Sequence, residues 1–578
     1  MHPTLAAVAL MLIACAGVPD APNAVESGAA PGQMKGPPVC PPGCINCDRP
    51  TGRCHDCQAA QNSCQNGDVV SCNPNGTWGK MVKHCGDGSC VNGACRTACD
   101  AAAESHSYIG CDYWPTTTLT SRLNPEFEFA VAIANPLVQE DGTPGGLAQV
   151  TITRGLKQIA QRTVAPGTVE TIVLPWVQEL AQLGGCVGLQ CYSLQEKSVR
   201  VEGGAYHLVS TLPVTVYQFS PLQFEQAETA NCWDWPKTGV CHSLTNDASI
   251  LLPSTALGEE YLVMARQSMQ LERPVPGFAA IVATADNTKV TVTSSAYTAS
   301  GPGVPELSPG SVANYSLMKG DVLELVSAYP NICQTSGFCD LGPKYDLTGT
   351  RINSDKPIQV IGGHACSYVP YNAQACDHLE EQISPLATWG KTVAVAQTRP
   401  QTLKDVNLWR ILSGSDQNQI TFDPPTAHGP VKLNAGQYLE FAFQGAFQAQ
   451  GTGRVAVGQY MVGQVFTGAK VGDPSMGLGV PVEQYRSSYD FLSPATYTKN
   501  DLTVIAPLPA KLTLDGQAVP SSPFPIGDTG LGYRYIALLP GAHHITGSAP
   551  FGITVSGIAA YTSYLFVGGQ ALNKIAVQ

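Results

Sequence analysis

The cysteines constrain this chain more than any other feature of its sequence. The 578 residues include 21 cysteines, of which ten lie between Cys40 and Cys95 and none follows Cys376. The stretch from Cys40 to Cys95 has too few apolar residues to form a core, so disulfide bonds must hold it together. We therefore predict a small disulfide-rich module over residues 39–98. Zinc bound by its paired C-x2-C motifs is the weaker alternative, because the cysteines are too numerous for one tetrahedral site.

Residues 1–14 indicate an export signal. The apolar run from Leu5 to Ala14 is too short to span a bilayer but has the length of a signal-peptide core. It ends at Leu12-Ile13-Ala14-Cys15, which resembles the lipobox of bacterial lipoproteins and implies lipidation of Cys15. We expect this lipid to be the chain's one attachment to a membrane, at the outer membrane or cell surface, with residues 15–38 as a flexible tether. The alternative is an ordinary secretory signal and a secreted protein.

Apart from Cys15, the cysteines are even in number, as expected of an exported chain whose thiols pair. The disulfide candidates beyond the first module are Cys99, Cys111, Cys186, Cys191, Cys232, Cys241, Cys333, Cys339, Cys366 and Cys376. They fall as neighbours in the sequence, and a bridge that closes such a short loop contributes about 2–3 kcal/mol of stability.

Composition favours β structure and excludes some partners. Charged residues are only 13% of the chain, and the 58 glycines and 44 prolines are typical of turn-rich sheets. Beyond Cys111 short runs of alternating apolar and polar residues are separated by turn residues, which predicts an all-β fold. A net charge of −12 and only 32 Lys and Arg residues supply no basic surface for a phosphate backbone, so we expect no nucleic-acid partner.

Four segments repeat the same order of strands, at 99–252, 253–384, 385–480 and 481–578. The last strand of a segment is usually preceded by a proline, as at Pro213, Pro357 and Pro550. We predict tandem β-sandwich-like pseudo-repeats behind the disulfide-rich module, with a propeller-like arrangement of the sheets as the alternative. Neighbouring cysteines occur at equivalent places in the first two segments.

Catalytic signatures are absent from the sequence: it has no H-E-x-x-H, G-x-S-x-G, P-loop or EF-hand pattern. The best polar constellation surrounds Cys366 and Cys376, whose bridge would bring His364 and His378 together with Asp377 and Glu380 as carboxylates. A zinc or calcium site, and with it a metal-dependent hydrolase, is one interpretation. A hydrogen-bonded core is the more common role for such histidines, so we expect no cofactor and no enzyme.

The strings Gly362-Gly363-His364-Ala365-Cys366, Cys376 to Gln382, Thr388-Trp389-Gly390-Lys391 and Gly472 to Met476 occur in this order. With them, residues from Cys99 to Gly569 resemble the IgGFc-binding protein N-terminal domain family. The second half of the disulfide-rich module resembles cysteine-rich modules of myxobacterial surface proteins, so the resemblance implies a bacterial surface lipoprotein.

The resemblance implies an extracellular adhesion or recognition protein without catalytic residues. We expect its partner to be an extracellular protein or glycan of unknown identity, and the family name alone does not predict Fc binding. Loops often form binding surfaces on rigid scaffolds, so the loops 186–191 and 333–339 are the predicted contact face. A structural spacer in the cell envelope is the alternative function.

Overall fold

The computed structural model describes most of the chain beyond residue 45. The described residues are 46–48, 53–58, 60–85, 89–139, 144–184, 186–187, 190–191, 196–229, 239–243, 245–270, 274–330, 339–373, 375–520 and 522–576. The predicted leader 1–14, the tether 15–38 with Cys15, and the disulfide candidates Cys232 and Cys333 lie outside them. The chain divides into two compact units, Met1–Cys95 and Arg96–Gln578.

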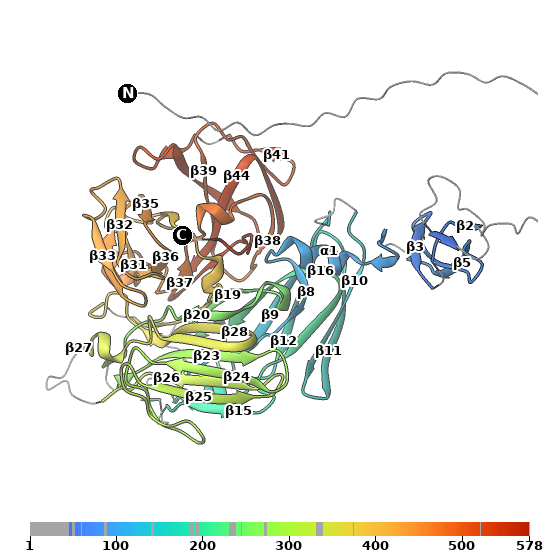
Figure 1. Ribbon diagram of the computed structural model, residues 1–578. Coiled ribbons are helices and arrows are strands. Elements are labelled where there is room, and N and C mark those ends of the chain that lie inside the picture. The colour runs from blue at the N-terminus through green and yellow to red at the C-terminus, as the bar shows by residue number, and fades with distance from the viewer. Residues whose placement is uncertain are drawn as a thin grey trace, which may run out of the picture. The chain divides into compact units, whose positions relative to one another are not determined.

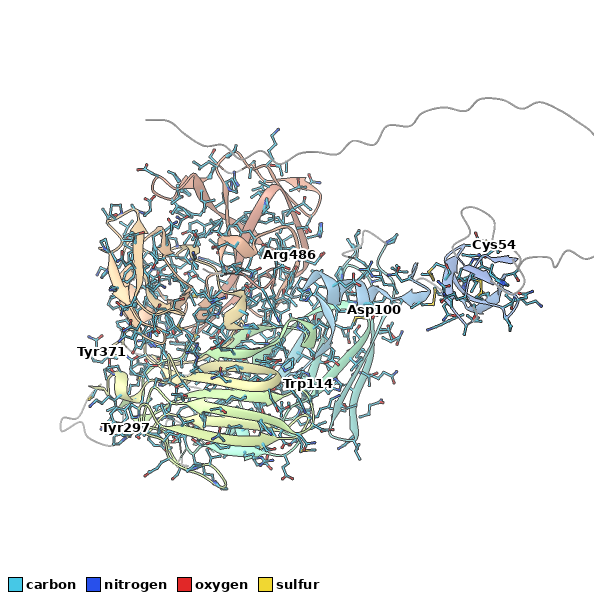
Figure 2. The ribbon with its side chains drawn as sticks, in the orientation of Figure 1. Cys54, Asp100, Trp114, Tyr297, Tyr371 and Arg486 are labelled. Atoms are coloured by element: carbon cyan, nitrogen blue, oxygen red, sulfur yellow. A yellow bond between two sulfur atoms is a disulfide. The ribbon has the colours of Figure 1, made fainter. Side chains whose placement is uncertain are left out.

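Disulfides hold the first unit. Its strands are β1 (Asn46–Asp48), β2 (Arg53–His55), β3 (Asn62–Gln65), β4 (Asp68–Cys72), β5 (Trp78–Lys83), β6 (Ser89–Val91) and β7 (Ala94–Arg96), and β3, β4 and β5 form an antiparallel sheet. Its bridges are Cys57–Cys72, Cys64–Cys90 and Cys85–Cys95, and Cys54 is also disulfide-bonded (Figure 2). Among the described residues of this unit, Val69 and Val70 are the only buried apolar side chains besides half-cystines. The cross-links therefore take the place of a core.

The second unit begins with α1 (Ala98–Ser105), which is fixed by a capping box. The Thr97 hydroxyl accepts the Asp100 N–H, and the Asp100 carboxylate accepts the Thr97 N–H. Two further short helices, α2 (Gln178–Ala181) and α3 (Gln464–Thr467), and single 3-10 turns η1 (Ser254–Ala256), η2 (Pro343–Tyr345), η3 (Leu386–Thr388) and η4 (Val482–Gln484) are the other helical elements described. No helix in the described part of the chain has the length and apolar character needed to cross a membrane.

The first two large sheets have seven and eight strands. The seven-stranded order is β11-β10-β16-β9-β12, with β8 and β19 also paired to β16. Its strands are β8 (Gly110–Tyr113), β9 (Phe129–Asn135), β10 (Ala148–Arg154), β11 (Lys157–Val164), β12 (Thr168–Leu174), β16 (His207–Ser220) and β19 (Asp247–Leu251). The eight-stranded order is β15-β26-β23-β28-β24-β25, with β20 and β29 paired to β28. Its strands are β15 (Val199–Val201), β20 (Gly258–Leu262), β23 (Gly277–Ala283), β24 (Thr288–Thr293), β25 (Val312–Leu317), β26 (Val322–Val326), β28 (Arg351–Ser367) and β29 (Asp377–Gln382).

The chain then forms two four-stranded sheets and a final eight-stranded sheet. The four-stranded orders are β30-β35-β32-β33 and β34-β31-β36-β37, and the last is β41-β40-β44-β39-β43-β42 with β38 and β45 paired to β44. The strands are β30 (Thr392–Ala396), β31 (Asn407–Ser413), β32 (Asn418–Asp423), β33 (Val431–Leu433), β34 (Tyr438–Phe443), β35 (Ala446–Gly451), β36 (Val455–Met461), β37 (Met476–Leu478), β38 (Arg486–Ser493), β39 (Lys499–Pro507), β40 (Leu512–Leu514), β41 (Gln517–Ala518), β42 (Phe524–Pro525), β43 (Leu531–Leu538), β44 (Gly541–Ala559) and β45 (Thr562–Val567).

Small ribbons complete the second unit: β13 (Cys186–Val187) with β14 (Gln190–Cys191), β17 (Glu225–Ala227) with β18 (Val240–His242), and β21 (Met269–Gln270) between β22 (Pro274–Val275) and β27 (Cys339–Asp340). The all-β class and the disulfide-rich first module are thus confirmed. One strand crosses between segments, because β15, which lies between strands of the first sheet in sequence, pairs with β26 of the second.

In three of the sheets one long strand changes partners halfway. In β28 residues 351–354 pair with β24 and residues 358–364 with β23. Likewise β16 passes from β10 to β9, and β44 passes from β38 and β40 to β39. Pro213, Pro357 and Pro550 lie where these changes occur. A proline cannot donate to a strand ladder, so it is tolerated where the ladder is interrupted.

The second half of each long strand pairs with one further strand: β19 on β16, β29 on β28 and β45 on β44. We call these three, together with β37 on β36, the inner strands, and they contact one another in a closed order. β19 contacts β29 and β45, and β37 also contacts β29 and β45. In Figure 1 the labelled strands β19 and β37 lie in the middle of the second unit, between its sheets. This ring has the closed order of the propeller-like alternative, although its sheets are bent and larger than four-stranded blades.

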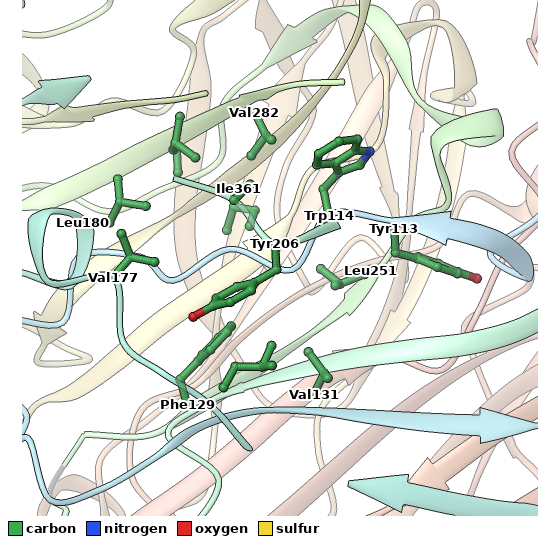
Figure 3. Packing of buried hydrophobic residues seen from close by; sticks show 14 of the residues in the cluster. Tyr113, Trp114, Phe129, Val131, Val177, Leu180, Tyr206, Leu251, Val282 and Ile361 are labelled. Carbon is green, nitrogen blue, oxygen red and sulfur yellow. The ribbon is translucent and has the colours of Figure 1, made fainter. Parts of the chain in front are cut away.

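Four apolar clusters fill the spaces between neighbouring sheets. One joins the first sheet to the second: Phe129 packs against Tyr206, and Val282 and Ile361 belong to the same cluster (Figure 3). Others join the second segment to the third, the third to the fourth, and the fourth back to the first. Each of these four cores is shared between segments, and burial of their side chains stabilises the ring as a whole. A further cluster, which includes Trp409 and Phe447, lies within the third segment alone.

Segments distant in sequence complete the ring. Ser107 forms a β-bridge with Ala571, and the Leu572 N–H donates to the His106 carbonyl at 2.6 Å. The Tyr108 hydroxyl donates to the Asp490 carbonyl at 2.9 Å. Residues just after the disulfide-rich module thus hold the fourth segment against the first.

Close backbone approach explains the Gly-Gly pair of β28, and replacement of Gly363 by alanine tests it. A Cβ at Gly363 would lie 1.9 Å from the Leu379 carbonyl oxygen of β29. We expect Gly363→Ala to lower the free energy of unfolding by at least about 1–3 kcal/mol, because the two strands must separate. Thermal unfolding measures this. Gly429→Ala, where a Cβ meets nothing within 4 Å, is the control, and equal midpoints for both variants would contradict the expectation.

Candidate functional site

Strand β29 carries three of the residues predicted for a metal site, and all six of its residues are buried. His378 Nε2 lies 3.4 Å from Glu380 Oε2, and the His378 ring stacks on Phe278. The Glu380 carboxylate also accepts the Thr118 hydroxyl at 2.8 Å and the Gln218 side-chain amide at 3.2 Å. Protein donors therefore already surround Glu380.

His364 is buried on the neighbouring strand β28, where its Nδ1 accepts the Cys366 N–H at 3.1 Å. Burial, and then the charge of Arg266, lowers the pKa of His364 to about 3, so its imidazole is neutral. The structure thus brings His378 and Glu380 together, whereas His364 bonds to its own strand. Among the described residues, no group of three or more His, Cys, Asp or Glu side chains is arranged to hold a metal ion.

Eight of the ten disulfide candidates lie among the described residues. Cys366 is bonded to Cys376 and Cys99 to Cys111, while Cys241 and Cys339 are each in a disulfide. Cys186 and Cys191 are opposite residues of the ribbon β13–β14. Most of the predicted contact loops lies outside the described residues, namely 188–189 and 331–338.

Asp247 links three inner strands. This fully buried carboxylate begins β19, and its Oδ2 accepts the Glu380 N–H of β29 at 3.1 Å and the Met476 N–H of β37 at 3.0 Å. Its Oδ1 accepts the Ala248 N–H at 2.9 Å. Burial raises the pKa of Asp247 well above its usual range despite these donors. The first residue of β19 therefore joins the Cys376 to Gln382 string to the Gly472 to Met476 string.

Further side-chain bonds join β19 and its neighbours to β29. The Asp377 carboxylate accepts the N–H groups of Asn246 and His378. The Gln382 N–H donates to the Ser249 hydroxyl at 2.8 Å, and the Gln382 side chain accepts the Leu252 N–H at 3.0 Å. Between β19 and β29 these bonds take the place of a backbone ladder, which explains polar residues in a fully buried strand.

The Gly472 to Met476 string has the same structural role on the other side of the ring. The hydroxyls of Ser475 and Ser563 lie 2.8 Å apart, joining the segment before β37 to β45. Burial raises the pKa of Asp473 to about 7, and burial followed by the charge of Asp473 raises that of Asp377 well above its usual range. The two carboxyls repel each other when both are ionised, so at least one holds a proton in acidic solution.

The cavity at the ring is too small for a substrate. It is lined by Glu381, Gln382, Leu478, Val567 and Gln570 among others, and its volume of ≈ 20 Å³ is about the space of one water molecule. A groove of ≈ 640 Å³ lies instead at the molecular surface, along the edge strand β25. It is lined by Arg200, residues 303–308 and residues 311–316. Another groove, of ≈ 400 Å³, is lined by residues 497–501, 537–540 and Arg399.

The fold also assembles a Ser-His-Asp group that no sequence motif marks. Ser493 Oγ lies 3.3 Å from His543 Nε2, and His543 Nδ1 lies 2.8 Å from Asp515 Oδ2. The Leu539 carbonyl, however, lies 2.6 Å from His543 Nε2 and accepts the Ser493 hydroxyl at 2.7 Å. Nε2 then carries a proton and cannot remove one from Ser493, so this group fastens a turn and is not arranged as a nucleophile and base.

The comparisons with known proteins agree with these motifs. Residues 247–557 match the family model described as IgGFc binding protein. The human IgGFc-binding protein is 27% identical over 304 residues, which cover 50% of this chain and 5% of the human protein. The matched residues include three of the four inner strands, β19, β29 and β37, and the lining of the groove along β25 apart from Arg200.

The buried carboxyl of Asp473 predicts a pH dependence of stability. An unfolded aspartate loses its proton near pH 3.9, whereas folded Asp473 retains it to about pH 7. The folded state holds more protons between these values, so stability falls as pH rises through this window. We expect Asp473→Asn to remove part of this fall, on the order of a few kcal/mol.

The measurement is thermal or denaturant unfolding of both proteins between pH 4 and pH 8. The difference between their midpoints should grow in favour of the asparagine variant as pH rises. A difference that is constant across this range would show that Asp473 does not hold a proton in the fold.

Proposed function

The chain belongs to the IgGFc-binding protein family, and we propose that it is an exported cell-surface protein that binds an extracellular protein. The family match across the ring supports binding as the function. The side chains that sequence reasoning assigned to a metal or to catalysis are engaged inside the fold, which favours binding over chemistry. The rigid ring presents its grooves as a fixed surface.

The Fc fragment is one protein to test, because the human relative is named for it. The match covers only 5% of that relative, so the name carries limited weight for this chain. A glycan is the other class of ligand that a surface of this kind serves. We favour a protein, because the larger groove lies along the edge of a strand. The backbone groups of such an edge can pair with the backbone of another polypeptide.

Immobilised full-length chain tests the proposal by its binding of defined proteins. The analytes are the Fc and Fab fragments of one IgG, together with separated extracellular proteins of the chain's own source. We expect saturable, reversible binding of at least one protein, with the analyte recovered unaltered. Binding of Fc and not Fab would extend the family name to this chain. If the immobilised chain bound none of these proteins, the result would favour the alternative, a structural spacer of the envelope.

Anchoring through Cys15 is a separate part of the proposal. Leu12-Ile13-Ala14-Cys15 supports lipidation, and the disulfides of both units support an oxidising compartment. We expect Cys15→Ser to move the protein from the membrane fraction to the medium or the soluble envelope fraction, because a lipid chain is what retains it. Fractionation with a fatty-acid label measures this, and Ala16→Ser is the control. Unchanged membrane retention of Cys15→Ser would exclude the anchor.

A further inference from the structure

Strand β25 is an edge strand of unusual composition. Its six residues, Val312-Ala-Asn-Tyr-Ser-Leu317, contain no charge and no proline, and they pair with β24 without a bulge. Among the described residues no strand pairs with its other side. Val312 is 58% exposed, and Asn314 and Ser316 are exposed as well. Such an edge is a template for another strand unless something blocks it.

The other strands at the ends of the large sheets are protected. β11, β12, β15, β33 and β34 each contain a charged residue, β41 has two residues, and β42 has two of which one is proline. The uncharged end strands β30 and β37 are mostly buried within the ring. Of the end strands described, β25 alone is long, exposed and unprotected. This contrast indicates a use for the edge, because natural sheets normally avoid such strands.

The register identifies which backbone groups are available. The Ser294 N–H donates to the Ser311 carbonyl, so residues 294 and 311 form a hydrogen-bonded pair. In an antiparallel ladder such pairs alternate, which directs the N–H and C=O groups of Val312, Asn314 and Ser316 away from β24. The side-chain bond between Thr291 and Asn314, at 2.7 Å, agrees with a non-hydrogen-bonded pair at that position.

The groove gives this edge an opposite wall. Residues 303–308 and Arg200 face residues 311–316 across a volume of ≈ 640 Å³, within the roughly 300–1,000 Å³ of ligand pockets. The wall itself is fixed, since the Thr298 N–H donates to the Leu307 carbonyl, the Leu307 N–H donates to the Thr298 hydroxyl, and Gly301 packs on the Ser198 carbonyl. The Tyr315 hydroxyl is enclosed and has no hydrogen-bond partner among the described residues.

We propose that β25 and this groove bind an extended segment of a partner protein, which adds to the eight-stranded sheet as a further strand. This inference rests on the proposed function and locates its contact surface. The N–H and C=O groups of residues 312, 314 and 316 supply affinity, and the groove wall selects side chains. The opposite wall admits one extended chain, whereas a second copy of the protein would bring the same wall with it.

The test is a displayed library of random dodecapeptides selected on the full-length chain. Asn314→Pro removes one outward N–H and leaves the bonds to β24 in place, because residue 314 does not donate to β24. Asn314→Thr keeps that N–H and is the matched control. We expect the proline variant to bind the selected peptides at least about tenfold more weakly, and the threonine variant to bind like the parent. Ser316→Lys, which places a charge at the edge, is a second variant in case the proline variant fails to fold.

Hydrogen exchange supplies the second readout. Bound peptide should slow exchange of the amides of residues 312, 314 and 316, and that of 313 and 315 should change little. Three results would overturn the assignment. The selected peptides could bind Asn314→Pro as tightly as the parent, they could slow amide exchange outside residues 312–316, or the library could yield no binding peptide. A dimer that Asn314→Pro abolishes would also overturn it, since that dimer would identify a second copy as occupant. The full-length chain could also bind a protein equally well with and without Asn314→Pro and Ser316→Lys. That result would support the proposed function and would exclude β25 as its site.

Discussion

The carboxylate of Asp247 is the interaction on which the second unit most depends. It begins β19 and accepts backbone N–H groups from β29 and β37. Those three strands belong to three different sheets, and no backbone ladder joins them to one another among the described residues. A buried oxygen that accepts two such donors satisfies groups that would otherwise cost free energy. Ser249, Gln382 and Asp377 add further bonds of this kind between β29 and the residues in and beside β19.

This arrangement explains the polar strings of the sequence without a ligand. The residues from Cys376 to Gln382 include three acidic side chains and one histidine, a composition typical of a metal or catalytic site. In the structure they form bonds between inner strands, and burial raises the pKa values of Asp377 and Glu381. The paired glycines at 362 and 363 let β28 approach its neighbours closely. The strings of this chain that resemble the family therefore lie at contacts within its ring.

Strand content and the disulfide-rich module were predictable from local pattern, because alternation and cysteine density act over a few residues. The prolines at 213, 357 and 550 correctly marked a repeated feature, and their position within bent strands follows from the missing N–H. Pairing across segments was not predictable. The position of β15 in the second sheet and the Ser493, His543 and Asp515 group depend on contacts between residues far apart in sequence. The exposed edge of β25 is visible only once the order of strands is known.

The bridge between Ser107 and Ala571 has a consequence for the order in which the second unit folds. This bridge and the bond from the Leu572 N–H to the His106 carbonyl form only when both ends of the unit are present. Contacts of such large sequence separation form late in folding. We therefore expect closure of the ring to be a late step, completed where the two ends of the second unit meet.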